Sequence, residues 1–241
     1  MALLEVRGIS KSFRGLRAVH KVSFDVEGGA IAAMIGPNGA GKTTCFNVIA
    51  GVFAPDAGEV TLGGERLTGL RPHRICRAGV GRTFQVVRPF PQMTVLENVV
   101  VGALNAAAHV ADAKREARRL LELLHLAGKS GALAASLTLP ERKRLEVARA
   151  MATRPRLLLL DEVMAGLRPT EVDEMVGVFR RINRETGLTI LLIEHVMRAV
   201  MALAGRVVVL HHGEKICDGT PGEVVRDPAV LECYLGEEAV G

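Results

Sequence analysis

Residues 36–43 have the sequence GPNGAGKT, which fits the pattern G-x-x-x-x-G-K-[ST] at every fixed position. Each position of this pattern suits a phosphate group. Glycines let backbone N–H groups turn toward phosphate oxygens, the Lys42 ammonium adds a charge for β- and γ-phosphates, and the Thr43 hydroxyl is placed to bind Mg²⁺. An apolar run at 30–35 precedes the loop and a helix-like segment follows it. The stretch 30–50 therefore predicts a strand, a phosphate loop and a helix.

The beginning of that helix adds unpaired N–H groups and a positive dipole end, so we expect the whole loop to surround the phosphates. The alternative is a glycine-rich turn that binds nothing. The candidate nucleotide-binding residues of the loop are Gly36, Pro37, Asn38, Gly39, Ala40, Gly41, Lys42, Thr43 and Thr44.

Polar side chains also follow two other apolar runs. Four leucines at 157–160 indicate a buried parallel strand, and Asp161 and Glu162 come directly after it. Ligands bind at the carboxyl ends of such strands, so Asp161 is a candidate Mg²⁺ ligand with Thr43, and Glu162 is placed to reach a water. His195 follows the strand predicted at 188–193 and faces the same ligand, although a lone His is more often structural. For Asp161 and Glu162, the alternative explanation is that they are solvated acidic residues at a strand end without a ligand.

Gln85 ends a short strand predicted over 79–85. A Gln there can complete a Mg²⁺ shell or orient a water. In isolation, a solvated loop residue is the more common explanation.

The N-terminal part predicts an antiparallel layer beside the phosphate-loop strand. Strands are expected at 3–8 and 19–26 with a turn at Gly15, and 58–67 reads as a hairpin that turns at a glycine pair. Phe13 lies between the first two strands. An aromatic ring ahead of a nucleotide site can stack on adenine, but from its position alone a core placement is favoured.

The middle of the chain lacks a strand pattern. Helices are predicted at 94–107, 111–127 and 141–152, the last with Thr138 as N-cap and Pro140 in its first turn. Pro89 and Pro91 break the segment 86–94, which predicts a loop that exposes Phe90 as a contact surface. We expect a helical lobe inserted in an α/β core.

The remainder returns to an α/β pattern. A helix at 170–185 and strands at 188–193, 206–210 and 215–218 are expected, and His211 and His212 form a solvated turn rather than a metal site. The tail at 220–234 indicates a capping helix. The chain is then one domain over 1–241, with an α/β core and antiparallel layer at 1–88 and 154–241 and a helical lobe at 89–153.

The amino-acid composition narrows the class of protein to which the chain can belong. The chain has 241 residues, a net charge of +5, seven Phe, one Tyr and no Trp, so a nucleic-acid partner gains little support. Four widely spaced cysteines argue against a zinc site or a disulfide framework and fit a reducing cytosol. No apolar stretch approaches the length of a membrane span and the N-terminus does not resemble a signal peptide, so we expect a protein that neither crosses a membrane nor is exported.

With the phosphate loop, Gln85, Asp161, Glu162 and His195 in this order, the chain resembles the nucleotide-binding domain of ABC transporters from end to end. Within that family it is similar to the ATP-binding subunit of branched-chain amino acid importers, the LivG type. The segments VGRTFQ at 80–85, MTVLEN at 93–98 and YLG at 234–236 carry the closer resemblance.

The resemblance implies a P-loop NTPase core of RecA type with ATP and Mg²⁺ as cofactors. It implies that Phe13 stacks on adenine beside Val19, that Gln85 links Mg²⁺ to the membrane partner, that Glu162 is the general base and that His195 contacts the γ-phosphate. Two such domains would enclose two ATP molecules and drive integral-membrane permease subunits by hydrolysis. The protein would be cytoplasmic, held at the inner face of the membrane by the permease.

Two departures from the family stand out. Its signature L-S-G-G-Q aligns with residues 137–141, LTLPE, in which Thr138 keeps the hydroxyl but Leu139 and Pro140 replace both glycines. Pro140 has no N–H to donate to a partner's γ-phosphate. Arg168 stands where the family more often has Asp. Because the signature serves the opposite nucleotide, we expect a heterodimer with a related ATPase that carries a complete signature, although a homodimer is possible.

Other classes fit less well. A phosphate-loop kinase or another non-transport ATPase needs neither Gln85 nor His195, and a DNA-repair or translation ATPase of this superfamily would show a coiled-coil insertion or two copies in one chain. A lipid-export ATPase is the strongest rival, because the permease selects the cargo.

Overall fold

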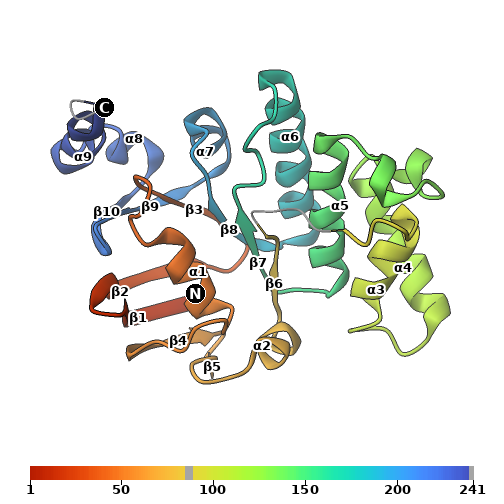
Figure 1. Ribbon diagram of the computed structural model, residues 1–241, viewed down its shortest axis with the longest axis horizontal. Helices are drawn as coiled ribbons and strands as arrows, with labels where there is room; N and C mark the ends of the chain where they lie inside the picture. The colour runs from red at the N-terminus through yellow and green to blue at the C-terminus, as the bar shows by residue number, and fades with distance from the viewer. Residues whose placement is uncertain (85–88, 239–241) are drawn as a thin grey trace.

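A computed structural model describes residues 1–84 and 89–238 of the chain, which contain two β-sheets and a set of helices (Figure 1). The first sheet has the order β2-β1-β4-β5 and the second the order β10-β9-β3-β8-β7-β6. The strands are β1 Ala2–Phe13, β2 Leu16–Glu27, β3 Ile31–Ile35, β4 Ala57–Leu62, β5 Glu65–Arg66, β6 Val80–Arg82, β7 Leu157–Asp161, β8 Thr189–Ile193, β9 Arg206–His211 and β10 Glu214–Gly219. The predicted antiparallel layer and α/β core are both present.

The second sheet sets the geometry of the site. Strands β9, β3, β8, β7 and β6 are parallel neighbours, and only β10 at the edge is antiparallel. Parallel strands end at the same edge of a sheet, where ligands bind in open α/β folds. The segments that follow β3, β6, β7 and β8 therefore emerge side by side.

Strand β3 separates two hydrophobic clusters because successive side chains point to opposite faces. Ala32 and Met34 belong to the cluster shared with the antiparallel sheet and helix α1, and Ile31, Ala33 and Ile35 to the cluster shared with the other helices. All five side chains are buried. This burial on both faces explains why the strand is a continuous apolar run.

The helices cover the sheet and form a lobe at one side of the molecule. Figure 1 shows α3, α4 and α5 gathered away from the antiparallel sheet, with α6 between them and α7. The helices are α1 Lys42–Ile49, α2 Pro72–Ala78, α3 Val95–Ala103, α4 Val110–Leu123, α5 Leu139–Ala152, α6 Pro169–Thr186, α7 Met197–Leu203, α8 Pro221–Val224 and α9 Pro228–Glu238, with short 3₁₀ turns at Ala127–Lys129 and Ala134–Ser136.

Local capping explains where α3 and α5 begin. Thr94 precedes α3 and exchanges hydrogen bonds with Glu97, and Thr138 precedes α5 with Glu141 in the equivalent position. The lobe helices are shorter than predicted at three of their ends, while α5 begins two residues before the predicted 141. The predicted tail helix is two helices, α8 and α9, because Asp227 and Pro228 restart the chain.

Helices α2 and α7 have no counterpart in the sequence prediction. Each has seven residues, and helices of that length depend on packing rather than on intrinsic propensity. The strand predicted over 79–85 ends at Arg82, and Gln85 lies outside the described residues.

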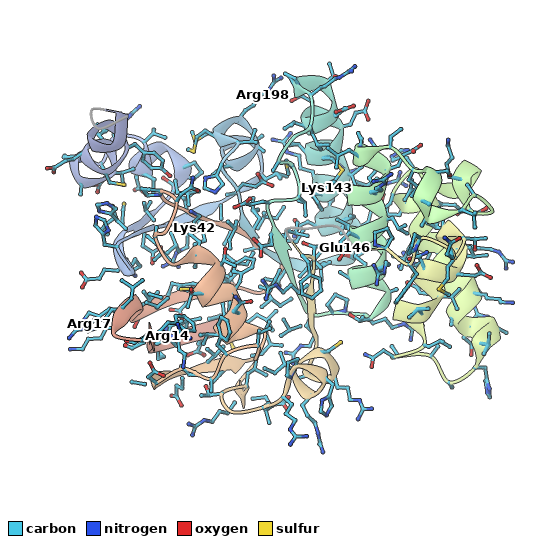
Figure 2. All side chains as sticks on the ribbon, in the orientation of Figure 1. Arg14, Arg17, Lys42, Lys143, Glu146 and Arg198 are labelled. Atoms are coloured by element: carbon cyan, nitrogen blue, oxygen red, sulfur yellow. The ribbon has the colours of Figure 1, made fainter. Side chains whose placement is uncertain are left out.

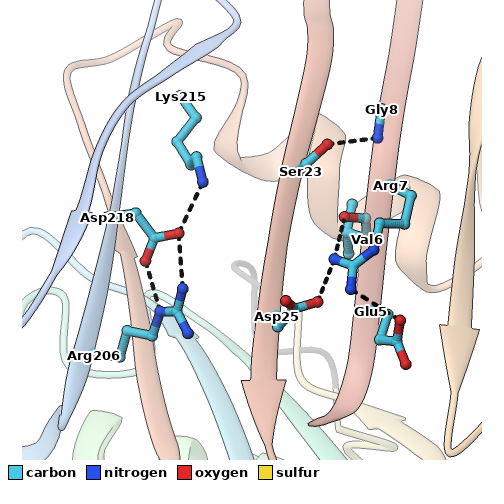
Figure 3. A network of polar contacts seen from close by, with 9 residues as sticks. All are labelled: Glu5, Val6, Arg7, Gly8, Ser23, Asp25, Arg206, Lys215 and Asp218. Atoms are coloured by element: carbon cyan, nitrogen blue, oxygen red, sulfur yellow. Dashed lines mark hydrogen bonds and ion pairs between the residues drawn. The ribbon is translucent and has the colours of Figure 1, made fainter.

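Charged groups join strands at the molecular surface (Figure 3). Arg7 of β1 pairs with Asp25 of the neighbouring strand β2, while Asp218 of β10 accepts from Arg206 Nε of β9 at 2.6 Å. Pairs of this kind at exposed positions contribute at most about 1 kcal/mol each. These ion pairs favour the alignment of neighbouring strands but contribute little to the free energy of unfolding.

Candidate nucleotide-binding site

The phosphate loop connects the end of β3 to α1, and two of its glycines cannot be replaced by a residue with a side chain. Gly36 and Gly41 have positive φ angles of 145° and 99°. A Cβ at Gly36 would lie 2.0 Å from the Leu210 carbonyl oxygen, and one at Gly41 would lie 2.3 Å from that of Ala18. The loop is thus pressed between β9 and β2, and only glycine allows both the backbone angles and the close approach.

Lys42 closes the loop from the first turn of α1 (Figure 2). Its side chain is buried, and Nζ donates to the carbonyl oxygens of Gly36 at 2.7 Å and Pro37 at 2.8 Å. A buried ammonium needs such acceptors to offset its desolvation. The loop therefore holds a positive charge at its centre, where a phosphate oxygen can bind.

A cleft of about 390 Å³ opens above the loop. It brings together four segments that lie far apart in the sequence: the start of β2, the phosphate loop with the first residues of α1, the residue after β7, and the turn between β9 and β10. Its lining consists of Leu16, Arg17, Ala18, Asn38, Gly39, Ala40, Gly41, Lys42, Thr43, Thr44, Glu162 and His212.

Most of the loop residues predicted from the sequence line this cleft, and Gly36 and Pro37 lie behind it as the acceptors for Lys42. Sequence reasoning missed Leu16, Arg17, Ala18 and His212. His212 is indeed an exposed turn residue, as predicted, but the turn closes over the nucleotide site because Gly213 N donates to the Ala40 carbonyl oxygen at 3.1 Å. No local pattern signals that contact.

Glu162 faces the cleft from the end of β7 and meets His195 from the end of β8. His195 Nε2 lies 3.1 Å from Glu162 Oε1. Glu162 has a left-handed φ of 50°, and its N–H donates to the Ile193 carbonyl oxygen at 3.0 Å. The two side chains are 33 residues apart in the chain and adjacent in space because β7 and β8 are parallel neighbours.

Asp161 is almost fully buried beside Glu162. Its Oδ2 accepts from Arg82 Nη2 at 3.0 Å, while Oδ1 has no hydrogen-bond partner among the described residues. Burial raises the pKa of Asp161, and the Arg82 guanidinium opposes that rise. A buried carboxylate oxygen without a partner is a suitable ligand for a hard cation, as is the exposed hydroxyl of Thr43. This donor set fits Mg²⁺.

Arg82 is a further residue at the site that the sequence did not single out. It lies at the end of β6, and Nη1 donates to Asn47 Oδ1 of α1 at 2.6 Å while Nη2 holds Asp161. It therefore ties the helix of the phosphate loop to the acidic strand end.

Three further predicted residues, Phe13, Val19 and Thr138, are not part of the cleft lining. Phe13 is 38% exposed and makes an edge contact with Phe53, so the core placement favoured from its position alone is wrong. Val19 is buried, and its Cγ2 would lie 3.4 Å from a Cβ at Gly41, so it supports the loop from behind. Thr138 caps α5, with its hydroxyl 3.0 Å from Glu141 Oε2.

The phosphate loop follows β3, and the acidic pair lies at the end of β7, which is separated from β3 by β8. This arrangement defines a P-loop nucleoside triphosphatase. The sequence profile of the ABC transporter family matches residues 19–165, and that of the branched-chain amino acid ATP-binding cassette transporter matches residues 214–240. The chain belongs to the ABC transporter family and is an ATP-hydrolysing, nucleotide-binding subunit.

Individual relatives are similar to this chain over almost its whole length. It is 41% identical to the high-affinity branched-chain amino acid transport ATP-binding protein BraF of Pseudomonas aeruginosa, with 98% of each chain covered. It is 34% identical to the lipopolysaccharide export system ATP-binding protein LptB of Escherichia coli, with 99% of each covered. Among solved structures, an ATP-binding cassette of an ABC transporter in its ADP conformation matches with a TM-score of 0.89 at 30% identity, covering 98% of this chain and 99% of the other.

Within residues 1–84 and 89–238, no helix is both long enough and apolar enough to span a lipid bilayer.

Proposed function

We propose that the chain binds Mg²⁺·ATP in the cleft above the phosphate loop and that its hydrolysis powers import of branched-chain or related amino acids. The observation that carries this proposal is that Lys42 and Thr43, after β3, and Glu162, after β7, line one cleft. The chain acts as a single nucleotide-binding domain over 1–241, with the α/β core and antiparallel layer at 1–88 and 154–241 and the helical lobe at 89–153.

Each site residue has a separate role in ATP hydrolysis. Glu162 accepts a proton from the attacking water, whose oxygen bonds to the γ-phosphorus while the bond to the β–γ bridging oxygen breaks, and ADP leaves. Lys42 and the loop N–H groups stabilise the charge that develops on the phosphate oxygens. His195, held by Glu162, contacts the γ-phosphate, and Phe13 stacks on adenine with Val19 behind the loop. Mg²⁺, when bound by Thr43, Asp161 and Gln85, neutralises β- and γ-phosphate charge.

The cargo assignment rests on similarity along the whole chain. The relative that transports branched-chain amino acids is more similar, at 41% identity, than the lipopolysaccharide exporter at 34%, and the C-terminal profile supports the same class. Lipid export remains the second candidate. Reconstitution with the permeases and binding protein of a branched-chain amino acid importer, followed by uptake of radiolabelled leucine, tests the choice, because the exporter alternative predicts no leucine uptake.

A second cleft, of about 290 Å³, lies between α2, β6, α3 and α5. We infer that the permease binds there. Three exposed apolar side chains line it: Val52, Phe84 and Val101, which are 49%, 56% and 41% exposed. Arg82 also lines it and pairs with Asp161, so this cleft adjoins the nucleotide site. An apolar surface of this kind suits a membrane subunit that holds the chain at the inner face of the membrane. V101D should abolish co-purification with the permease and leave nucleotide binding intact, whereas unchanged co-purification would exclude this cleft.

The beginning of α5 supports a heterodimer. Glu141 accepts from the Thr138 N–H at 2.9 Å, and that hydrogen bond lowers the pKa of the Glu141 carboxyl. The helix N-terminus is therefore already occupied by an anion of its own chain, which disfavours a partner's γ-phosphate there. Leu139 is 45% exposed at the same place. A related ATPase with a complete signature would then serve the nucleotide bound to this chain.

Mixing this chain with a candidate partner ATPase that carries a complete signature, and measuring ATP turnover of each alone and of the mixture, tests the heterodimer. We expect low turnover alone and high turnover in the mixture. Full turnover of this chain alone would exclude the heterodimer and leave the homodimer.

A further inference from the structure

Two buried charged residues lie beside Glu162 without a part in the steps above. Lys143 on α5 is 5% exposed, and Glu194 directly after β8 is 1% exposed. Lysine and glutamate are rarely buried to this degree unless a partner compensates the desolvation. Both make their hydrogen bonds to backbone groups at the nucleotide site.

Lys143 reaches from the helical lobe to the acidic strand end. Its Nζ donates to the backbone carbonyl oxygen of Glu162 at 3.0 Å. Burial lowers the pKa of Lys143, and nearby carboxylates, Glu194 foremost, oppose that change. Figure 2 labels Lys143 on α5, near the strands of the parallel sheet. The ammonium is therefore a cation shared by the backbone of Glu162 and the acids around it.

Glu194 joins the two segments that carry Glu162 and His195. Its Oε1 accepts the N–H of Met164, two residues after Glu162, at 2.8 Å. The backbone N–H of His195 lies close enough to the same carboxylate to oppose the rise of its pKa that burial causes. One buried side chain thus fixes the backbone after β7 relative to the backbone after β8.

The backbone of Glu162 needs such support. A non-glycine residue at φ 50° is strained by about 1–2 kcal/mol and persists only where surrounding contacts hold it. Lys143 holds the Glu162 carbonyl, Ile193 holds its N–H, and Glu194 holds the following turn at Met164. Together they direct the Glu162 carboxylate to the cleft and to His195.

We propose that Lys143 and Glu194 are positioning residues that hold Glu162 and His195 in their reactive arrangement, and that Lys143 couples the helical lobe to Glu162. This inference rests on the proposed function of Glu162. Helix α5 begins at the signature segment 137–141, which serves the opposite nucleotide in the proposed dimer. A displacement of α5 by that nucleotide would therefore act on Glu162 through Lys143.

The test uses the full-length chain in the assembly that gives the highest ATP turnover, with kcat, KM and equilibrium nucleotide affinity measured separately. K143M removes the donor and keeps the length of the stem, and K143R restores a donor. E194L removes the acceptor, and E194Q keeps an acceptor oxygen without the charge. R180M is the matched control, because Arg180 Nε also donates from a helix to a backbone carbonyl, that of Ala202 at 3.2 Å, away from the cleft lining.

We expect K143M and E194L to lower kcat by at least about tenfold, since small displacements of a reacting group have effects of that size. Nucleotide affinity should remain close to that of the parent chain, and both variants should stay folded at the assay temperature, with a thermal stability lowered by the lost buried hydrogen bond. K143R and E194Q should recover most of the turnover, and R180M should not change it.

Three results would overturn the inference: parental kcat in K143M and E194L, an equal loss in R180M, or a loss of nucleotide affinity that matches the loss of turnover. E162Q measured in parallel separates this failure from that of the proposed function. If E162Q keeps parental turnover, the general base is misassigned, whereas an inactive E162Q with active K143M and E194L rejects only the positioning residues.

Discussion

His195 Nε2 and Glu162 Oε1 lie 3.1 Å apart at the ends of neighbouring parallel strands. The contact orients the carboxylate that faces the phosphate loop. We therefore expect the two residues to act as a unit.

Replacement of Glu162 by Gln should lower kcat by at least about 100-fold, because an amide cannot accept the proton of the attacking water. H195A should also lower kcat, and the double variant should lose little more than E162Q, because residues that act as a unit have non-additive effects. Nucleotide affinity should stay near the parental value. E65Q, on the exposed hairpin strand β5, serves as the control, and additive losses in the double variant would argue against a shared function.

Asp161 and Arg82 should behave as a buried pair. R82M leaves the Asp161 carboxylate without its cation, and we expect a stability loss of about 3 kcal/mol in urea unfolding. The double variant R82M/D161N should regain much of that loss, since the buried charge is gone. If R82M is as stable as the parent chain, the pair does not contribute in the way its burial suggests.

D161N should also remove the Mg²⁺ dependence of nucleotide binding. The parent chain should bind ATP at least about tenfold more tightly with Mg²⁺ than with EDTA, because the metal joins Asp161 to the phosphates. The variant should bind ATP equally in both. A tenfold Mg²⁺ effect that persists in D161N would remove Asp161 from the metal site.

Glu194 should make stability depend on pH. Burial raises its pKa from 4.5 to about 7, so the folded state holds the proton more tightly than the unfolded state. The stability from this group is fully present below the unfolded pKa and is lost as the pH rises through about 7. Between pH 5 and 8 the parent chain should therefore lose on the order of 2 kcal/mol that E194Q does not lose. Urea unfolding of both at each pH measures the difference, and parallel pH curves would contradict it.

A restored signature should activate the chain by itself. L139G/P140G/E141Q removes the internal anion and the residue without an N–H, so a second copy could serve the γ-phosphate. We expect ATP turnover of the chain alone to rise by at least about tenfold, given the usual effect of oxyanion donors. Turnover in the mixture with the companion ATPase should change much less. An unchanged rate for the chain alone would show that another feature limits it.

Some of this site was predictable from local sequence. The phosphate loop is encoded within eight consecutive residues, because two glycines, a lysine and a hydroxyl must follow a buried strand at fixed spacing. The acidic pair after four leucines and the histidine after the next strand were likewise predicted, since parallel strands end at one edge of a sheet.

Other parts depend on contacts between residues distant in sequence. Arg82, His212, Lys143 and Glu194 are site neighbours only because strand order and helix packing bring them there. Phe13 is exposed because its strand end extends beyond the core, which its residue type alone does not reveal.

The sequence by itself determined the phosphate loop, the alternation of strands and helices, and the family to which the chain belongs, because these follow from short-range spacing and side-chain chemistry. Only the tertiary structure decided which charges are buried, which backbone is strained and which side chains share a cleft. Burial and hydrogen bonding between distant segments depend on strand order and helix packing, and no local window of sequence contains that information.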